Sequence, residues 1–146
     1  MKYCVREVDA SDDEIAEIIH DFNRAAEPKF PALKEHELEG PHCYWWLAYH
    51  EGEPVGFAGM VPSRLYKNAG YLKRAGVVPE HRGRGLQLRF FQAREAKARK
   101  VGWNMLVSEC TDTIYSANNF IRAGYKLFEP KERWAFSHSL YWCKAL

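Results

Sequence analysis

At 146 residues the chain is long enough for one domain that buries about two thirds of its unfolded surface, and we expect a single domain over residues 1–146. With 21 basic and 19 acidic residues its formal net charge is +2, which argues against nucleic acid or a membrane as main partner. Four widely spaced cysteines, no membrane-length apolar run and no signal-peptide pattern argue against a metal site, a disulfide framework and secretion, so we expect a cytoplasmic protein.

The first half of the chain is predicted to form two helices and four strands. Ser11 and Glu14 make a capping box before apolar residues at helical spacing, and Pro28 ends that pattern. Aromatic and apolar stretches separated by turns at Gly52 and Gly70 favour successive antiparallel strands. The predicted helices are residues 12–25 and 32–38, and the predicted strands are residues 3–8, 43–50, 55–61 and 71–78.

The strand that ends near Pro79 leads into a turn with two glycines between arginines. Gly83 and Gly85 lack a Cβ, so a ligand can approach the backbone there and positive φ angles are cheap. A helix that starts at this turn directs unpaired N–H groups and the positive end of its dipole outward. Such an end suits a pyrophosphate, and Arg82 and Arg84 add positive charge. Taken alone, the same residues are equally typical of a solvated basic turn.

After this turn the pattern predicts a helix, a buried strand, a second helix and two closing strands. Apolar residues recur with a period near 3.6 from Leu86 onward, and Gly102 is a candidate C-cap. The last strand would carry Trp134 and His138 on one face. The predicted helices are residues 87–102 and 114–123, and the predicted strands are residues 103–110, 125–128 and 134–143.

Residues 77–87 resemble motif A of the GNAT superfamily of N-acetyltransferases. In that motif Arg/Gln-x-x-Gly-x-Gly/Ala follows a strand that often ends Val-x-Pro-Glu. Arg82 matches the first position and Gly85 the second. Gln87 stands where the family usually has Gly or Ala, which puts a larger side chain beside the pyrophosphate but keeps the main-chain N–H.

A second segment, residues 116–125, resembles the helix-into-strand motif of the same family. Gly124 and Tyr125 match its Gly-Phe step, where glycine lets the helix end. The two matches, in the expected order, imply the GNAT fold. This α/β fold has a mixed, mostly antiparallel sheet of six to seven strands, flanked by about four helices and splayed at two central parallel strands.

The resemblance implies acetyl-CoA as co-substrate and no metal. It implies direct transfer of the acetyl group to a primary amine of a small molecule or a protein. Backbone groups of Val77 and Val78 would meet the pantetheine and the acetyl oxygen, and the glycine turn would wrap the pyrophosphate. The implied cofactor-binding residues are Val77, Val78, Arg82, Gly83, Arg84, Gly85, Leu86, Gln87, Asn118, Asn119 and Phe120.

The catalytic groups are less clearly marked in the sequence. An alkylammonium acceptor has a reference pKa near that of lysine, about 10.4, so a base must remove its proton. Glu109 is the first candidate, because its strand end borders the splay; an ion pair with Lys73 or Arg74 is the alternative. His138 is the second candidate, with a hydrogen-bonded core histidine as the alternative. Val77 would offer one main-chain donor to the acyl oxygen.

Phe120 stands where many family members carry a tyrosine that protonates the leaving thiolate. Phenylalanine cannot donate that proton, and it would instead pack against the pantetheine or the core. A catalytically weak or inactive CoA-binding regulatory or scaffold module is therefore an alternative function. Polyanion binding by the basic helix is a third hypothesis, which the near-neutral net charge disfavours. The sequence does not decide the chemical class of the acceptor, nor whether the protein forms a homodimer.

Overall fold

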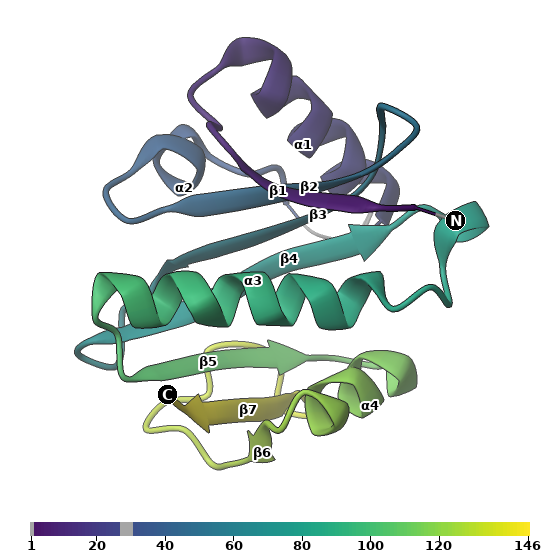
Figure 1. Ribbon diagram of the computed structural model, residues 1–146. Coiled ribbons are helices and arrows are strands. Elements are labelled where there is room, and N and C mark those ends of the chain that lie inside the picture. The colour runs from purple at the N-terminus through teal and green to yellow at the C-terminus, as the bar shows by residue number, and fades with distance from the viewer. Residues whose placement is uncertain (1, 27–30) are drawn as a thin grey trace.

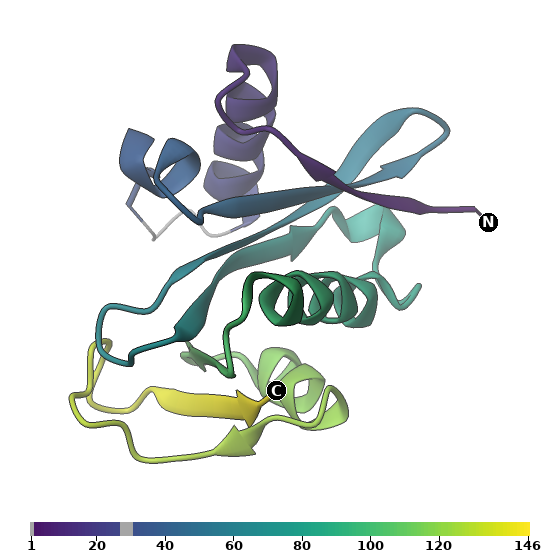
Figure 2. The same ribbon diagram turned by 60° about the vertical axis from the view of Figure 1, so that its left-hand side comes forward.

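The computed structural model describes residues 2–26 and 31–146, and Pro28, the predicted end of the first helix, lies outside them. A seven-stranded sheet, in the order β1-β2-β3-β4-β5-β7-β6, forms the centre of the described residues (Figures 1 and 2). The strands are β1 (Cys4–Val8), β2 (Tyr44–His50), β3 (Glu53–Pro62), β4 (Ala69–Val77), β5 (Met105–Cys110), β6 (Lys126–Leu127) and β7 (Leu140–Ala145). The helices are α1 (Asp13–Ala26), α2 (Glu35–Glu39), η1 (Pro79–His81), α3 (Leu86–Val101) and α4 (Ile114–Arg122).

Helices cover both faces of the sheet, and each face has its own apolar core. Successive residues of a strand point to opposite faces, so the apolar run of β2 supplies both cores. Trp46 and Ala48 pack with residues of α3 and α4. Trp45 and Leu47 pack with residues of α1 and α2. The sheet is therefore buried on both faces at its centre.

Strands β4 and β5 are parallel neighbours that stay paired over only part of their length. Residues 69–71 of β4 pair with residues 105–107 of β5, and the ladder ends there. Beyond these pairs the two strands separate toward their carboxyl ends, as Figure 1 shows. All other neighbouring strands are antiparallel. The predicted mixed sheet, mostly antiparallel and splayed at two central parallel strands, is confirmed.

A β-bulge interrupts β4 close to the splay. Ala58 of β3 lies opposite Ala75, whereas its neighbour Gly59 lies opposite Lys73, so Arg74 is an extra residue in the ladder. Arg74 has a φ of +35°, an uncommon conformation for a residue with a side chain. A bulge bends its strand and increases the local twist, which contributes to the divergence of β4 from β5.

The predicted capping box at Ser11 is wrong. Asp12 caps α1, because its Oδ1 accepts hydrogen bonds from the N–H groups of Glu14 and Ile15 at 3.0 and 3.2 Å. The Ser11 hydroxyl instead donates to Asp9 Oδ1 at 2.6 Å. Because the Ser11 hydroxyl is bound to Asp9, it does not cap the helix. Helix α1 begins one residue later than predicted.

The predicted last strand, residues 134–143, is also corrected. Strand β7 begins only at Leu140 and runs to Ala145, where it pairs with the whole of β5. The preceding segment is held in a turn by Arg133, whose Nη2 donates to the carbonyl oxygens of Ser137 and Ser139, both at 2.9 Å. The alternating aromatic residues before Leu140 therefore belong to this connection and not to the sheet.

A buried ionic network joins α3 to the closing strands. Glu95 is only 6% exposed, and Lys144 Nζ donates to its Oε1 at 2.8 Å. Tyr125 donates its hydroxyl proton to Oε2 at 3.0 Å, and Lys144 also donates to the carbonyl of Ala123 at 2.7 Å. Both carboxylate oxygens thus have partners from elements that lie far from α3 in the sequence.

We expect Glu95→Gln to lower the free energy of unfolding by about 2 kcal/mol, because it weakens charge-assisted hydrogen bonds to a buried group. Urea unfolding followed by circular dichroism measures this change. Glu132→Gln is the matched control, since Glu132 is exposed and should change stability by less than about 0.5 kcal/mol. Equal effects of the two substitutions would contradict a structural role for the network.

Candidate active site

A cavity of about 130 Å³ opens where β4 and β5 separate. Its lining includes Tyr71 and Leu72, which are neighbours on β4, and Ser108 and Glu109, which are neighbours on β5. Because successive strand residues point to opposite faces, a cavity lined by both members of each pair reaches both faces of the sheet. The gap between β4 and β5 is therefore open from one face of the sheet to the other. The two strands make no ladder pairs with each other along it.

On one face of the sheet, α3 and α4 form the wall of this cavity. Gln87, Phe91 and Arg94 of α3 and Ser116, Asn119 and Phe120 of α4 line it. Asn118 is exposed and does not contribute to the lining, so the structure brings only one of the two predicted asparagines to the cavity.

The glycine turn stands at the N-terminus of α3. Gly83 and Gly85 have φ angles of +74° and +79°, and Gly85 is the N-cap of the helix. A Cβ added at either position would meet no heavy atom within 4 Å, so open space lies in front of both. The first helical turn has no intrahelical acceptors for its N–H groups, and those of Leu86 and Gln87 point out of the helix end. The Leu86 side chain is buried in the core and anchors the turn.

The end of β4 is tied to this turn by main-chain contacts. Arg82 donates from Nε to the carbonyl oxygen of Val77 at 3.0 Å. Val78 donates its N–H to the carbonyl of Val55 at 2.9 Å and accepts a hydrogen bond from the N–H of His81 at 3.0 Å. Antiparallel pairs alternate in direction, so the N–H of Val77 points away from β3 and toward the side of the splay. Both main-chain groups of Val78 already have partners within the protein.

On the other face of the sheet, Glu109 is held by two donors. Its Oε1 accepts hydrogen bonds from the Tyr71 hydroxyl and from Trp134 Nε1, the latter at 2.6 Å. Burial and the negative charge of Glu109 raise the pKa of Tyr71 well above its usual value, so the phenol keeps its proton at neutral pH. Tyr71 and Trp134 thereby orient the carboxylate, and Oε2 receives no hydrogen bond from the described residues.

Lys73 and Arg74 of β4, the alternative ion-pair partners of Glu109, have other partners. Lys73 Nζ forms an ion pair with Glu37 Oε1 at 3.1 Å. Arg74 Nε donates to Asn23 Oδ1 at 3.0 Å. Arg74 and Asn23 both line the cavity, so the bulge and α1 form the wall opposite α3 and α4.

His138 does not join this site. Its Nε2 lies 3.1 Å from Asp112 Oδ2, both side chains are exposed, and neither residue lines the cavity. The correction of the last strand explains this position, because His138 belongs to the connection before β7 and not to a core-facing strand.

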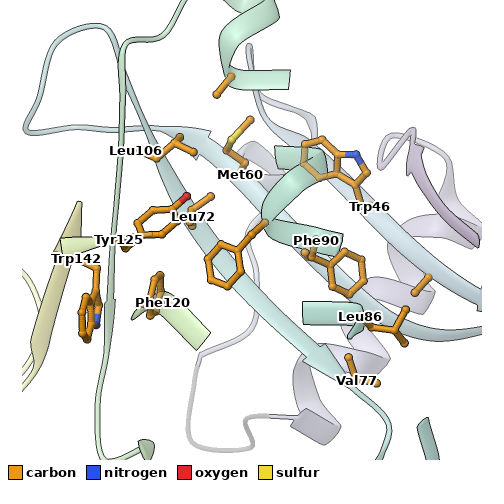
Figure 3. Close-up of a cluster of buried hydrophobic side chains, with 14 of the residues drawn as sticks. Trp46, Met60, Leu72, Val77, Leu86, Phe90, Leu106, Phe120, Tyr125 and Trp142 are labelled. Atoms are coloured by element: carbon orange, nitrogen blue, oxygen red, sulfur yellow. The ribbon is translucent and has the colours of Figure 1, made fainter. Parts of the chain in front are cut away.

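Phe120 is part of an aromatic cluster in the cavity wall. Its ring stacks on Trp142, with ring centroids 5.4 Å apart, and meets Tyr125 edge-on at 5.4 Å (Figure 3). It also meets Phe91 edge-on, with ring centroids 5.3 Å apart. The residue is 8% exposed. Phe120 therefore shapes the wall and supplies no proton.

Sequence reasoning missed several residues of this site. Tyr71 and Trp134 come from positions 38 and 25 residues away from Glu109, and neither has a local signal that separates it from a core aromatic residue. Arg94 is 2% exposed, and burial lowers its pKa to about 10, so it stays charged at neutral pH. It donates to the carbonyls of Phe90 and Gly59 at 3.2 and 3.4 Å. The only sequence signal for Arg94 as a site residue is a charged side chain at a position of the helix that faces the core.

A second cavity, of about 520 Å³, lies beside the first and shares Tyr71 with it. It is bounded by α2, the β3–β4 connection and the connection before β7. Trp134 also lines it, so both side chains that donate to Glu109 face this space. The group formed by Tyr71, Glu109 and Trp134 therefore lies where the two cavities meet.

Within residues 2–26 and 31–146 no helix combines the length and the apolar character needed to cross a bilayer. In the same residues no three side chains of the metal-binding types gather in one place.

Comparisons with known proteins were made by sequence and by fold. The sequence model of the acetyltransferase (GNAT) family matches residues 12–125. No curated protein matches the sequence. A Klebsiella pneumoniae structure described as an acyl-CoA N-acyltransferase is 24% identical and has a TM-score of 0.79, over 99% of this chain and 97% of that one. The ribosomal-protein-S18-alanine N-acetyltransferase of Escherichia coli is 12% identical with a TM-score of 0.76, over 99% and 94%. A Bacillus subtilis acetyltransferase in complex with CoA is 13% identical with a TM-score of 0.75, over 99% of both chains.

Proposed function

The chain belongs to the acetyltransferase (GNAT) family and is an N-acetyltransferase, and from this premise we propose that it moves an acetyl group from acetyl-CoA directly to a primary amine of a small molecule or a protein. The observation that carries the proposal is the passage through the sheet at the splay. A turn suited to a diphosphate lies on one side of it, and an oriented carboxylate lies on the other. We include a cytoplasmic location in the proposal, because four widely spaced cysteines without a paired motif favour it.

The residues at the start of α3 fit the diphosphate of coenzyme A. Open space in front of Gly83 and Gly85 leaves room for it, and the N–H groups of Leu86 and Gln87 are available as donors. Arg84 is exposed beside them and adds positive charge. Asn119 and Phe120, which line the cavity, would contact the pantetheine arm. Bound acetyl-CoA would supply an acyl thioester at the splay.

In the proposed chemistry, Glu109 accepts the proton of the acceptor ammonium, directly or through a water. The neutral amine nitrogen then forms a bond with the acyl carbon, and the bond between that carbon and sulfur breaks. The N–H of Val77 would stabilise the negative charge that develops on the acyl oxygen. The nitrogen loses its second proton to water, and the departing thiolate takes a proton from water in turn, because Phe120 has none to give.

The test is the release of free thiol from acetyl-CoA in the presence of a panel of primary amines. We expect release that depends on the amine, together with a product heavier than the acceptor by one acetyl group. The control is the same reaction without amine, which should release thiol slowly. Calorimetric binding of CoA with no turnover on any amine would instead favour a catalytically weak or inactive CoA-binding regulatory or scaffold module. Absence of both binding and turnover would overturn both functions.

A further inference from the structure

We propose that the acceptor carries a carboxylate in addition to its amine, and that the second cavity binds this carboxylate through Arg64. The inference rests on the proposed function and narrows its substrate class to amino-acid-like amines. A cavity of about 520 Å³ has the size that small-molecule sites usually have.

The wall of the second cavity carries an excess of positive charge. Lys34, Arg64 and Lys73 contribute three positive charges and Glu37 one negative charge, so the lysine, arginine and glutamate side chains of the wall carry a net charge of +2. The ion pair of Lys73 with Glu37, at 3.1 Å, cancels one charge of each sign. Lys34 and Arg64 account for the excess. A diamine or polyamine would bring a second cation against this wall, whereas a carboxylate would be attracted.

Arg64 is suited to bind a carboxylate. Arg64 is exposed in the β3–β4 connection, and one of its terminal nitrogens, Nη2, lies 3.4 Å from His36 Nε2. A guanidinium has five N–H donors in a planar fork, which matches the two oxygens of a carboxylate. The contact with His36 uses one nitrogen and steadies the side chain. The remaining donors can bind an anion that enters the cavity.

The second cavity adjoins the group formed by Tyr71, Glu109 and Trp134. Tyr71 and Trp134 line the second cavity and both donate to Glu109. Glu109 itself lines the first cavity, so an acceptor in the second cavity would reach this carboxylate where the two cavities meet and would have the cationic wall at its other end. The amine would face Glu109, and the acceptor's own carboxylate would face Arg64. Oppositely charged ends of one small molecule thus meet oppositely charged parts of the wall.

The experiment compares L-amino acids with their methyl esters and with the diamine putrescine as acceptors, using the wild-type protein and Arg64→Ala. We expect kcat/KM for amino acids to exceed that for the esters and for putrescine by at least about tenfold, the effect of one hydrogen bond to a charged group. Arg64→Ala should raise KM for amino acids by a similar factor and leave kcat and the ester kinetics unchanged. Lys67→Ala removes the same charge from the same connection outside the cavity, and it should change neither.

The outcomes separate this inference from the proposed function. Acetylation of esters or putrescine as efficient as that of amino acids would overturn the carboxylate site while leaving the acetyltransferase intact. Equal losses with both kinds of acceptor in Arg64→Ala would do the same. Failure to acetylate any amine would instead refute the proposed function.

Discussion

Gly85→Val should lower the affinity for acetyl-CoA by about 100-fold, the loss of one or two charge-assisted hydrogen bonds at about 1.5–3 kcal/mol each. Gly85 has a φ of +79°, which a β-branched side chain adopts only with strain. A Cβ there enters the open space in front of the helix end, which is the space we assign to the diphosphate. Isothermal titration calorimetry with CoA measures the change.

The control for this substitution is Gly52→Val. Gly52 has a φ of +80° and also has no heavy atom within 4 Å of an added Cβ, but it lies in the hairpin between β2 and β3. The two variants should lose similar stability to thermal unfolding, since their backbone strain is matched. Only Gly85→Val should lose CoA binding. Similar CoA affinities for the two variants would refute the proposed diphosphate site.

Glu109→Gln should lower kcat by about 10³-fold, within the range of 10² to 10⁴ that general-base catalysis supplies. Glutamine keeps an oxygen that accepts the hydrogen bonds from Tyr71 and Trp134, so the local packing should survive. It cannot take a proton from the acceptor ammonium. Steady-state kinetics with a saturating amine measure the loss, and KM for acetyl-CoA should stay the same.

The matched control is His138→Gln, which removes the second candidate base. His138 is exposed and pairs with Asp112 away from the cavity, so we expect kcat within about twofold of wild type, a difference near the spread of surface substitutions. A large loss of kcat in His138→Gln, with no loss in Glu109→Gln, would show that Glu109 is not the general base and that His138 is.

The order of helices and strands could be predicted because each depends on neighbours in the sequence. Periodic apolar residues gave the helices, and turn residues gave the hairpins. The errors arose where a short-range side-chain contact, which the apolar pattern does not reveal, decided the local structure: Asp9 binds the Ser11 hydroxyl, and Arg133 binds carbonyls four and six residues away. Arg133 binds two carbonyls in the connection before β7, and that contact replaced a strand that the alternation of aromatic residues had predicted.

The turn before α3 was determined by the sequence itself, because a helix N-terminus and glycines at positive φ are local properties of Gly83 and Gly85. The meeting of Tyr71, Glu109 and Trp134 was decided only by the tertiary structure. They come from β4, β5 and the connection before β7, and they meet because β4 and β5 diverge after three residue pairs. A divergence of two strands is a long-range property, since it depends on a bulge in one strand and on the helices packed against both.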